Sequence, residues 1–127
     1  MTQHIELCIK EGRTGLENFL VKQEKLLDDT SKCMLKEHSS QKRELFEELL
    51  TLNIEMRDFV KEMLAAEFDP RFTAWNKHMR YYWEDGVKVR VDAYETDYGY
   101  EYLGTAPLLV QTSFTRGCYV DFARALF

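Results

Sequence analysis

The side chains that could do chemistry in this sequence are few and scattered. His4 and Cys8 stand four residues apart, the spacing at which two metal ligands share one face of a helix. A zinc site needs three or four ligands, and we find no third ligand to complete this pair. His38 and His78 each lack a cysteine or carboxylate at the spacing of a nucleophile and its base. We therefore expect no metal site and no catalytic residue.

The cysteines indicate reduced thiols. Cys8, Cys33 and Cys118 are odd in number and form no CxxC pair, which argues against a disulfide framework and for an intracellular protein. Cys118 stands next to an expected helix start and near Arg116, where a thiol can become reactive. The alternative, a small buried apolar side chain, is the one that we favour.

Composition excludes two classes of partner. The chain has 127 residues, of which 45% are hydrophobic and 31% charged, as in a globular or coiled-coil protein. Its net charge of -5 opposes binding to the phosphate backbone of nucleic acids. It contains no run of about 18 apolar residues that could span a membrane, and its N-terminus lacks the pattern of a signal peptide. We expect neither nucleic-acid nor membrane partners.

Two long helices are expected to position everything else. Residues 16–35 have apolar side chains at helical spacing, and residues 41–66 have them in steps of 4, 3, 4, 3 and 4. This second series is the apolar seam, formed by Leu45, Leu49, Leu52, Met56, Phe59 and Met63. A seam with a period of about 3.5 residues needs a partner helix, so we predict an antiparallel pair. Before the pair, residues 5–9 fit a short strand as well as a helix.

The second half of the chain is expected to contain a helix and a hairpin. Asp69-Pro70 predicts a helix start, and the aromatic pattern predicts that this third helix continues to Trp83, before a turn at Asp85-Gly86. Residues 87–93 alternate as a half-buried strand, which residues 95–97 turn back into a second strand. That second strand is predicted to carry three aromatic rings on one face, those of Tyr98, Tyr100 and Tyr102.

The C-terminal stretch is expected to be a buried strand followed by a helix. Residues 108–112, LLVQT, are apolar and short enough for a strand. A helix capped by Thr115 should follow, and its apolar face is predicted to consist of Tyr119, Phe122, Ala123, Leu126 and Phe127. Arg116 and Gly117 weaken its first turn, because a helix N-terminus disfavours a cation and glycine disfavours helix. The fold class is thus α+β: antiparallel helices, then a β-hairpin and a short C-terminal helix.

The order of several short motifs resembles dynein heavy chains, where the linker ends and the first AAA+ module of the motor ring begins. Residues 98–104, YGYEYLG, are similar to the family's Y-G-[YF]-E-Y-L-G. Leu109, Val110, Gln111 and Thr112, with Thr115, Cys118, Tyr119, Ala125 and Leu126, are similar to L-V-x-T-P-L-T-D-x-C-Y followed by A-L. Upstream, Trp75 with residues 79–83 is similar to W-x-x-x-[LM]-R-[FY]-Y. The match covers roughly the last 55 residues.

The resemblance implies a division of the chain and a nucleotide contact. Residues 1–84 would be a helical linker-like region, residues 85–104 the hairpin, and residues 105–127 the N-terminal edge of an incomplete AAA+ module. Leu109, Val110, Gln111 and Thr112 would contact the adenine of ATP or ADP in the intact parent; from composition alone, a buried strand is the better interpretation. The sequence departs from the family at Ser113, Phe114, Arg116 and Gly117, where the family has Pro, Leu, Asp and a basic residue.

The resemblance also implies partners, but not activity of this chain alone. The parent would be an ATP-driven, minus-end-directed microtubule motor of the cytoplasm, cytoskeleton or ciliary axoneme, and the chain's partners would be the rest of the ring and linker, the other dynein subunits and microtubules. Phosphate binding needs a G-x-x-x-x-G-K-[ST] loop, and no lysine follows Gly117, the last glycine. Asp28 and Asp29 fit a solvated helix face better than a Mg²⁺ site. We therefore expect no bound cofactor and no ATPase activity for the isolated chain. The rival hypothesis is a free-standing helical protein-protein interaction module.

Overall fold

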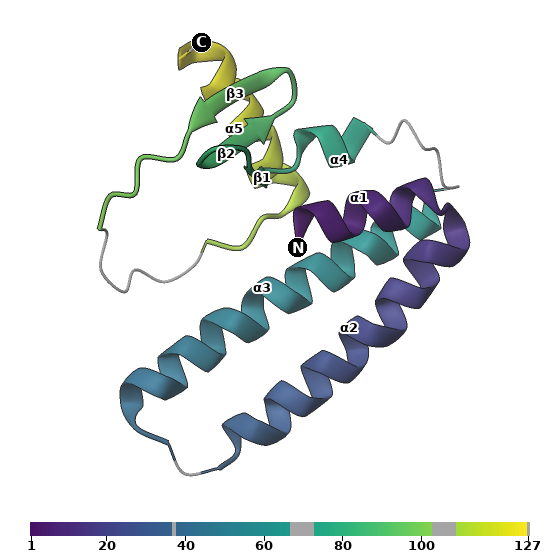
Figure 1. Ribbon diagram of the computed structural model, residues 1–127, viewed down its shortest axis with the longest axis vertical. Coiled ribbons are helices and arrows are strands. Elements are labelled where there is room, and N and C mark those ends of the chain that lie inside the picture. The colour runs from purple at the N-terminus through teal and green to yellow at the C-terminus, as the bar shows by residue number, and fades with distance from the viewer. Residues whose placement is uncertain (37, 67–72, 103–108, 127) are drawn as a thin grey trace.

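A long helical hairpin carries a small α+β unit at one end (Figure 1). The computed structural model describes residues 1–36, 38–66, 73–102 and 109–126. In chain order the elements are α1 (Thr2–Lys10), α2 (Arg13–Met34), α3 (Ser40–Ala65), α4 (Thr73–Lys77), β1 (Arg80–Trp83), β2 (Val87–Val91), β3 (Tyr94–Asp97) and α5 (Ser113–Leu126). The predicted α+β class is confirmed.

Helices α2 and α3 form the predicted antiparallel pair, and α1 packs at the end of the pair where α2 begins and α3 ends (Figure 1). Residues 5–9, whose sequence fits a strand as well as a helix, are therefore helical. Two glycines make the α1–α2 corner possible: Gly12 takes a φ of 79°, and a Cβ on Gly15 would lie 2.5 Å from the carbonyl oxygen of Cys8. Glycine at these positions permits a left-handed turn and close helix packing, which outweigh its low helix propensity.

The core lies at the end of the hairpin where α1, α2, α3 and α4 meet. Its buried members are Ile5, Cys8, Leu16, Phe19, Phe59, Val60, Met63 and Trp75. The apolar seam of α3 is only partly buried: Phe59 and Met63 are in the core, whereas Leu45, Leu49 and Leu52 are 44 to 65% exposed. The prediction that the whole seam packs against a partner helix is wrong for this N-terminal half.

The three strands form an antiparallel sheet in the order β1-β2-β3. Val91 pairs with Tyr94, so Asp92 and Ala93 form a two-residue turn, and Asp92 has a φ of 55°. A short polar side chain tolerates this left-handed conformation, and the turn therefore comes earlier than predicted. The strand predicted over residues 87–93 is confirmed as β2, although it ends at Val91. It pairs with β3 and not with the predicted tyrosine strand.

Two further predictions in this region are wrong. The helix predicted to reach Trp83 ends at Lys77, and residues 80–83 form β1. Arg80 and Tyr82 on one face of this strand are buried, whereas Tyr81 and Trp83 on the other are more exposed, a period of two. Residues 98–102 form no strand, and Tyr102 is 96% exposed. The helix start predicted at Asp69-Pro70 lies outside the described residues. Among the helices that the structure describes, none has the length and apolar content to cross a membrane.

Candidate nucleotide-contacting segment

Residues 109–112 belong to no helix or strand and lead into α5. The expectation of a buried strand is wrong here, since the side chains of Leu109 and Val110 are 65% and 47% exposed. Leu108 lies outside the described residues. The segment thus presents apolar side chains to its surroundings, without a neighbouring strand to pair with among the described residues.

Two threonines fix the geometry where this segment enters α5. The Thr115 N–H donates to the Thr112 hydroxyl at 3.2 Å, and the Thr112 N–H donates to the Thr115 hydroxyl at 2.7 Å. This is the reciprocal arrangement of a capping box, with Thr112 as the N-terminal cap. Thr115 was predicted to be the cap; it is instead the third helical residue, which returns the bond. The helix start is therefore well defined, and the expected weakening of the first turn is offset.

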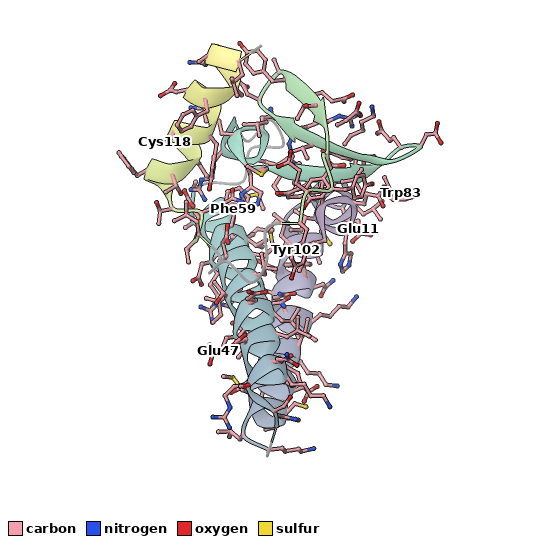
Figure 2. All side chains as sticks on the ribbon, turned by 90° about the vertical axis from the view of Figure 1, so that its left-hand side faces the viewer. Glu11, Glu47, Phe59, Trp83, Tyr102 and Cys118 are labelled. Carbon is pink, nitrogen blue, oxygen red and sulfur yellow. The ribbon has the colours of Figure 1, made fainter. Side chains whose placement is uncertain are left out.

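Arg116 holds α5 against α3. Its guanidinium donates to both carboxylate oxygens of Glu62, at 3.1 and 2.8 Å, and lies 4.9 Å from the centre of the Phe59 ring. The side chain is 8% exposed. An arginine fits this position because its planar group binds a carboxylate with two bonds while stacking on a ring. Figure 2 shows Phe59 where α3 reaches the C-terminal unit.

A groove of about 520 Å³ runs between α3 and residues 110–112. Its α3 wall carries three carboxylates, those of Glu55, Asp58 and Glu62, and its other wall includes Val110, Gln111, Thr112 and Arg116. Burial raises the pKa of the Glu55 carboxyl, although the Gln111 N–H and the charge of Arg116 oppose this. The Gln111 N–H thus donates a hydrogen bond to the Glu55 carboxyl group on α3.

The charges of this groove decide which part of a nucleotide it could contact. Arg116 is already paired with Glu62, so the groove has a negative balance that repels phosphate. An uncharged base has no such penalty, and it stacks on apolar side chains. The geometry therefore suits the base and not the phosphates. Sequence reasoning identified Val110 and its neighbours but missed Phe59, Glu62 and the structural role of Arg116; an arginine in a first helical turn was the available signal.

Helix α5 packs through a different face from the one predicted. Arg116 and Val120 are buried, whereas Phe122 and Leu126 are 66% and 75% exposed. Phe127 lies outside the described residues. The predicted apolar face is therefore covered only in part, since Tyr119 and Ala123 are half-buried, and the most buried side of α5 is the one that carries the arginine.

The other residues singled out for chemistry have structural surroundings. His4 packs edge-on against Phe19 at 5.4 Å, and His78 stacks against both Phe59 and Trp75, which also contact each other. Burial, together with Arg116 and Arg80, lowers the pKa of His78 to about 4. Burial also raises the pKa of Cys8. Cys118 is free and half-buried. In the described ranges, no three His, Cys, Asp or Glu side chains are arranged to hold a metal ion.

These features define a mixed α+β segment. A hairpin of two helices packs at one end against a small sheet and a capped C-terminal helix. The edge at this helix is open, and an arginine anchors the helix to the hairpin. No protein-family model matches the chain. Individual proteins do: it is 32% identical over 121 residues to dynein axonemal heavy chain 12 of Rattus norvegicus, a match that covers 93% of this chain. It is 31% identical over 123 residues to dynein axonemal heavy chain 11 of Sus scrofa, again over 93% of the chain. The cytoplasmic dynein heavy chain of Dictyostelium discoideum is 32% identical over 115 residues, or 80% of the chain.

This chain therefore belongs to the dynein heavy chain family. The similarity includes the N-terminal helices, for which the sequence motifs gave no specific signal, because it covers nearly the whole chain. The chain spans about 4% of the length of the rat protein and 3% of the pig protein. Its relatives include both axonemal and cytoplasmic heavy chains.

Proposed function

We propose that this chain is the part of a dynein heavy chain in which the end of the linker meets the first AAA+ module. Residues 1–84 are then the linker-like region, residues 85–104 the hairpin region, and residues 105–127 the edge of the module. In the intact motor, Leu109, Val110, Gln111 and Thr112 contact the adenine of ATP or ADP. The observation that carries the proposal is the exposed apolar segment 109–112, which α5 and α3 hold in place.

Two properties of the segment support adenine rather than phosphate as the ligand group. Exposed Leu109 and Val110 side chains offer apolar cover for a flat base. The capping bonds of Thr112 and the Arg116–Glu62 pair fix the backbone in advance, which lowers the entropy lost on binding. The acidic wall of the groove repels phosphate and so leaves phosphate binding to other parts of the motor.

The function of the whole protein follows from this placement. It is an ATP-driven, minus-end-directed microtubule motor in which the junction transmits nucleotide-dependent ring movement to the linker. The partners of this chain are the remaining ring and linker, the other dynein subunits and, through the parent, microtubules. Its location is the cytoskeleton, in the cytoplasm or the axoneme.

A motor chimaera tests the adenine contact. Residues 98–126 of this chain replace the corresponding residues of a complete dynein motor, and ATPase kinetics are measured. Val110→Asp should raise the KM for ATP by about 10-fold, because a desolvated carboxylate against a base costs binding free energy. Asp121→Asn, at a side chain that is 80% exposed on α5, is the matched control and should leave KM unchanged. Equal KM values for the two variants would contradict the proposal.

The isolated chain is expected to hydrolyse no ATP. A phosphate-release assay on the purified 127 residues should give the rate of the buffer alone, since the chain has no phosphate-binding loop. Turnover that is lost on substitution of Val110 or Thr112 would refute this expectation.

A second candidate function is a helical protein-protein interaction module. It is favoured by the exposed part of the apolar seam, Leu45, Leu49 and Leu52, which leaves a helix face uncovered. The transcript sequence beyond the codon of Phe127 separates the two functions. A glycine-rich loop that ends in Lys-Ser or Lys-Thr supports the motor, and a stop codon supports the module.

A further inference from the structure

A second cavity, of about 490 Å³, lies between α3, the sheet and the segment that follows β3. Its volume falls in the range of small-molecule sites, about 300 to 1,000 Å³. Most of its lining is aromatic or aliphatic, and its most prominent members are three tyrosines, Tyr81, Tyr98 and Tyr100. One carboxylate, that of Glu55, is among the described residues that line it.

The three tyrosine rings are arranged at steep angles to one another. The Tyr81 and Tyr98 rings are 6.4 Å apart with an interplanar angle of 72°, and the Tyr98 and Tyr100 rings are 5.1 Å apart at 88°. Rings that meet edge to face present π faces in several directions. Ring faces attract alkylated ammonium groups, and proteins bind such groups with several aromatic rings.

This arrangement requires an unfavourable backbone conformation. Tyr100 has a φ of 52°, a left-handed conformation that costs a non-glycine residue free energy. Its hydroxyl accepts a hydrogen bond from the Val87 N–H at 3.1 Å, and the Tyr98 N–H donates to the Val87 carbonyl at 2.9 Å. Both tyrosines are thus fixed to β2, although their rings are 42% and 63% exposed.

Glu55 supplies the charge that a cation would complement. Its Oε1 is buried and has no hydrogen-bond partner among the described residues. Burial raises the pKa of Tyr81, and the nearby Tyr98, Tyr119 and Glu55 raise it further, which places the carboxylate near the rings. Arg116, the cation that acts on Glu55, is already paired with Glu62. His78 also lines the cavity, and because burial lowers its pKa to about 4, it is uncharged at neutral pH.

We propose that Tyr81, Tyr98, Tyr100 and Glu55 form a binding site for an alkylated ammonium group. The rings hold its methyl groups by cation-π attraction and apolar contact, and the Glu55 carboxylate balances its charge. The group is carried either by a small molecule or by a methylated lysine side chain of a protein. This site shares Glu55 and Gln111 with the groove beside residues 110–112, its three tyrosines line this cavity alone, and the proposal does not depend on nucleotide binding.

Ligand-observed NMR on the 127-residue chain tests the charge requirement. The probes are choline and 3,3-dimethylbutanol, which has the same shape without the charge. Choline methyl signals should shift upfield and receive saturation from tyrosine ring protons, and the neutral alcohol should bind about 3- to 30-fold more weakly, the range of a cation-π contact. Equal binding of the two probes, or binding of neither, overturns the proposal. Acetylation of the N-terminus removes the competing ammonium of Met1, which also lines the cavity.

Matched variants locate the site. Tyr98→Leu should abolish choline binding and Tyr98→Phe, which keeps the ring, should retain it; Tyr102→Leu is the control, because Tyr102 is 96% exposed and does not line the cavity. Glu55→Gln should weaken the binding of choline with little effect on the binding of the alcohol, and it tests the proposal even if Tyr98→Leu unfolds. The same losses in Tyr98→Leu and Tyr102→Leu would refute it. Short peptides with lysine or trimethyl-lysine then show whether a protein side chain can be the source.

Discussion

The two halves of α3 carry the same apolar seam with opposite results. In the C-terminal half, Phe59 and Met63 are 3% and 1% exposed, because α1, α2 and α4 surround them there. In the N-terminal half, Leu45 and Leu49 are 65% and 44% exposed, since α2 alone lies beside them among the described elements (Figure 1). Figure 2 shows the same contrast between Phe59 at the covered end and Glu47 on the open shaft. A helical period predicts which face is apolar, but burial depends on how many elements pack against it.

The largest expected effect comes from the covered half. Phe59→Ala should lower the free energy of unfolding by about 3 to 5 kcal/mol, because it leaves a cavity between Trp75, His78 and the Arg116 guanidinium. Leu45→Ala, on the same seam, should change it by less than about 0.5 kcal/mol, as at other exposed positions. Urea unfolding followed by circular dichroism measures both. Similar losses at the two positions would contradict the distinction between the halves.

His78 makes the covered half sensitive to pH. Burial lowers its pKa in the folded state to about 4 from an ordinary value of 6.5, so the unfolded chain binds the proton more tightly. Stability should therefore fall as the pH drops from 6.5 to 4, by about 3 kcal/mol from this group. The raised pKa of Glu55 acts in the opposite sense, because the folded state then binds protons more readily. Urea midpoints between pH 7.5 and pH 4 measure the slope.

His78→Phe is the matched variant for this pH effect. Phenylalanine keeps a flat ring against Phe59 and Trp75 but cannot bind a proton. The variant should lose less stability than the parent between pH 6.5 and pH 4. An unchanged slope would show that other groups cause the acid sensitivity.

A buried amide pair marks the middle of the hairpin, between the two halves. The Gln23 Nε2 donates to the Asn53 Oδ1 at 2.6 Å, and both residues are at most 5% exposed. Gln23→Leu should destabilise the chain by about 1 to 3 kcal/mol, because the Asn53 oxygen then remains unpaired. The double variant Gln23→Leu/Asn53→Leu should recover most of this loss. A double-mutant cycle by urea unfolding checks the coupling, and additive losses would contradict it.

The smallest expected effect concerns the attachment of α5 to the covered half. Arg116→Ala should cost about 1 to 2 kcal/mol, less than for a fully buried pair, because Glu62 is 48% exposed and can be hydrated. The loss should be confined to α5, whose amides should exchange hydrogen faster while those of α2 keep their protection. Arg116→Lys should restore only part of it, since an ammonium cannot bind both carboxylate oxygens and stack on Phe59. Uniform loss of protection would contradict this local role.

The sequence predicted the helical hairpin better than the sheet for a physical reason. Helices α2 and α3 are 22 and 26 residues long, so their period repeats many times. Strands β1 and β3 have four residues each, and aromatic residues in β1 fit either a helix or a strand. The tyrosine run has strand-like alternation, but the turn at Asp92 had already provided β2 with a partner. Residues 98–102 were left outside the sheet.

Parts of the candidate site, too, could be predicted from the sequence, and other parts could not. The resemblance implied an adenine contact at Leu109 to Thr112, which stays a prediction, whereas the helix predicted from apolar spacing is present as α5. The family assignment agrees with the resemblance. The sequence could not reveal the Arg116–Glu62 pair, whose members are 54 positions apart. It also interpreted Arg116 as a defect of the helix start, because the compensating carboxylate belongs to another helix.

By itself, the sequence determined the family, the α+β class and the antiparallel helices, because these depend on local spacing and on motif order along the chain. Only the tertiary structure decided which half of the apolar seam is covered, where Arg116 finds its partner and that three tyrosines surround one cavity with Glu55. Burial, charge pairing and ring geometry depend on residues that are distant in the chain. Their contacts exist only once the helices, the sheet and α5 have packed together.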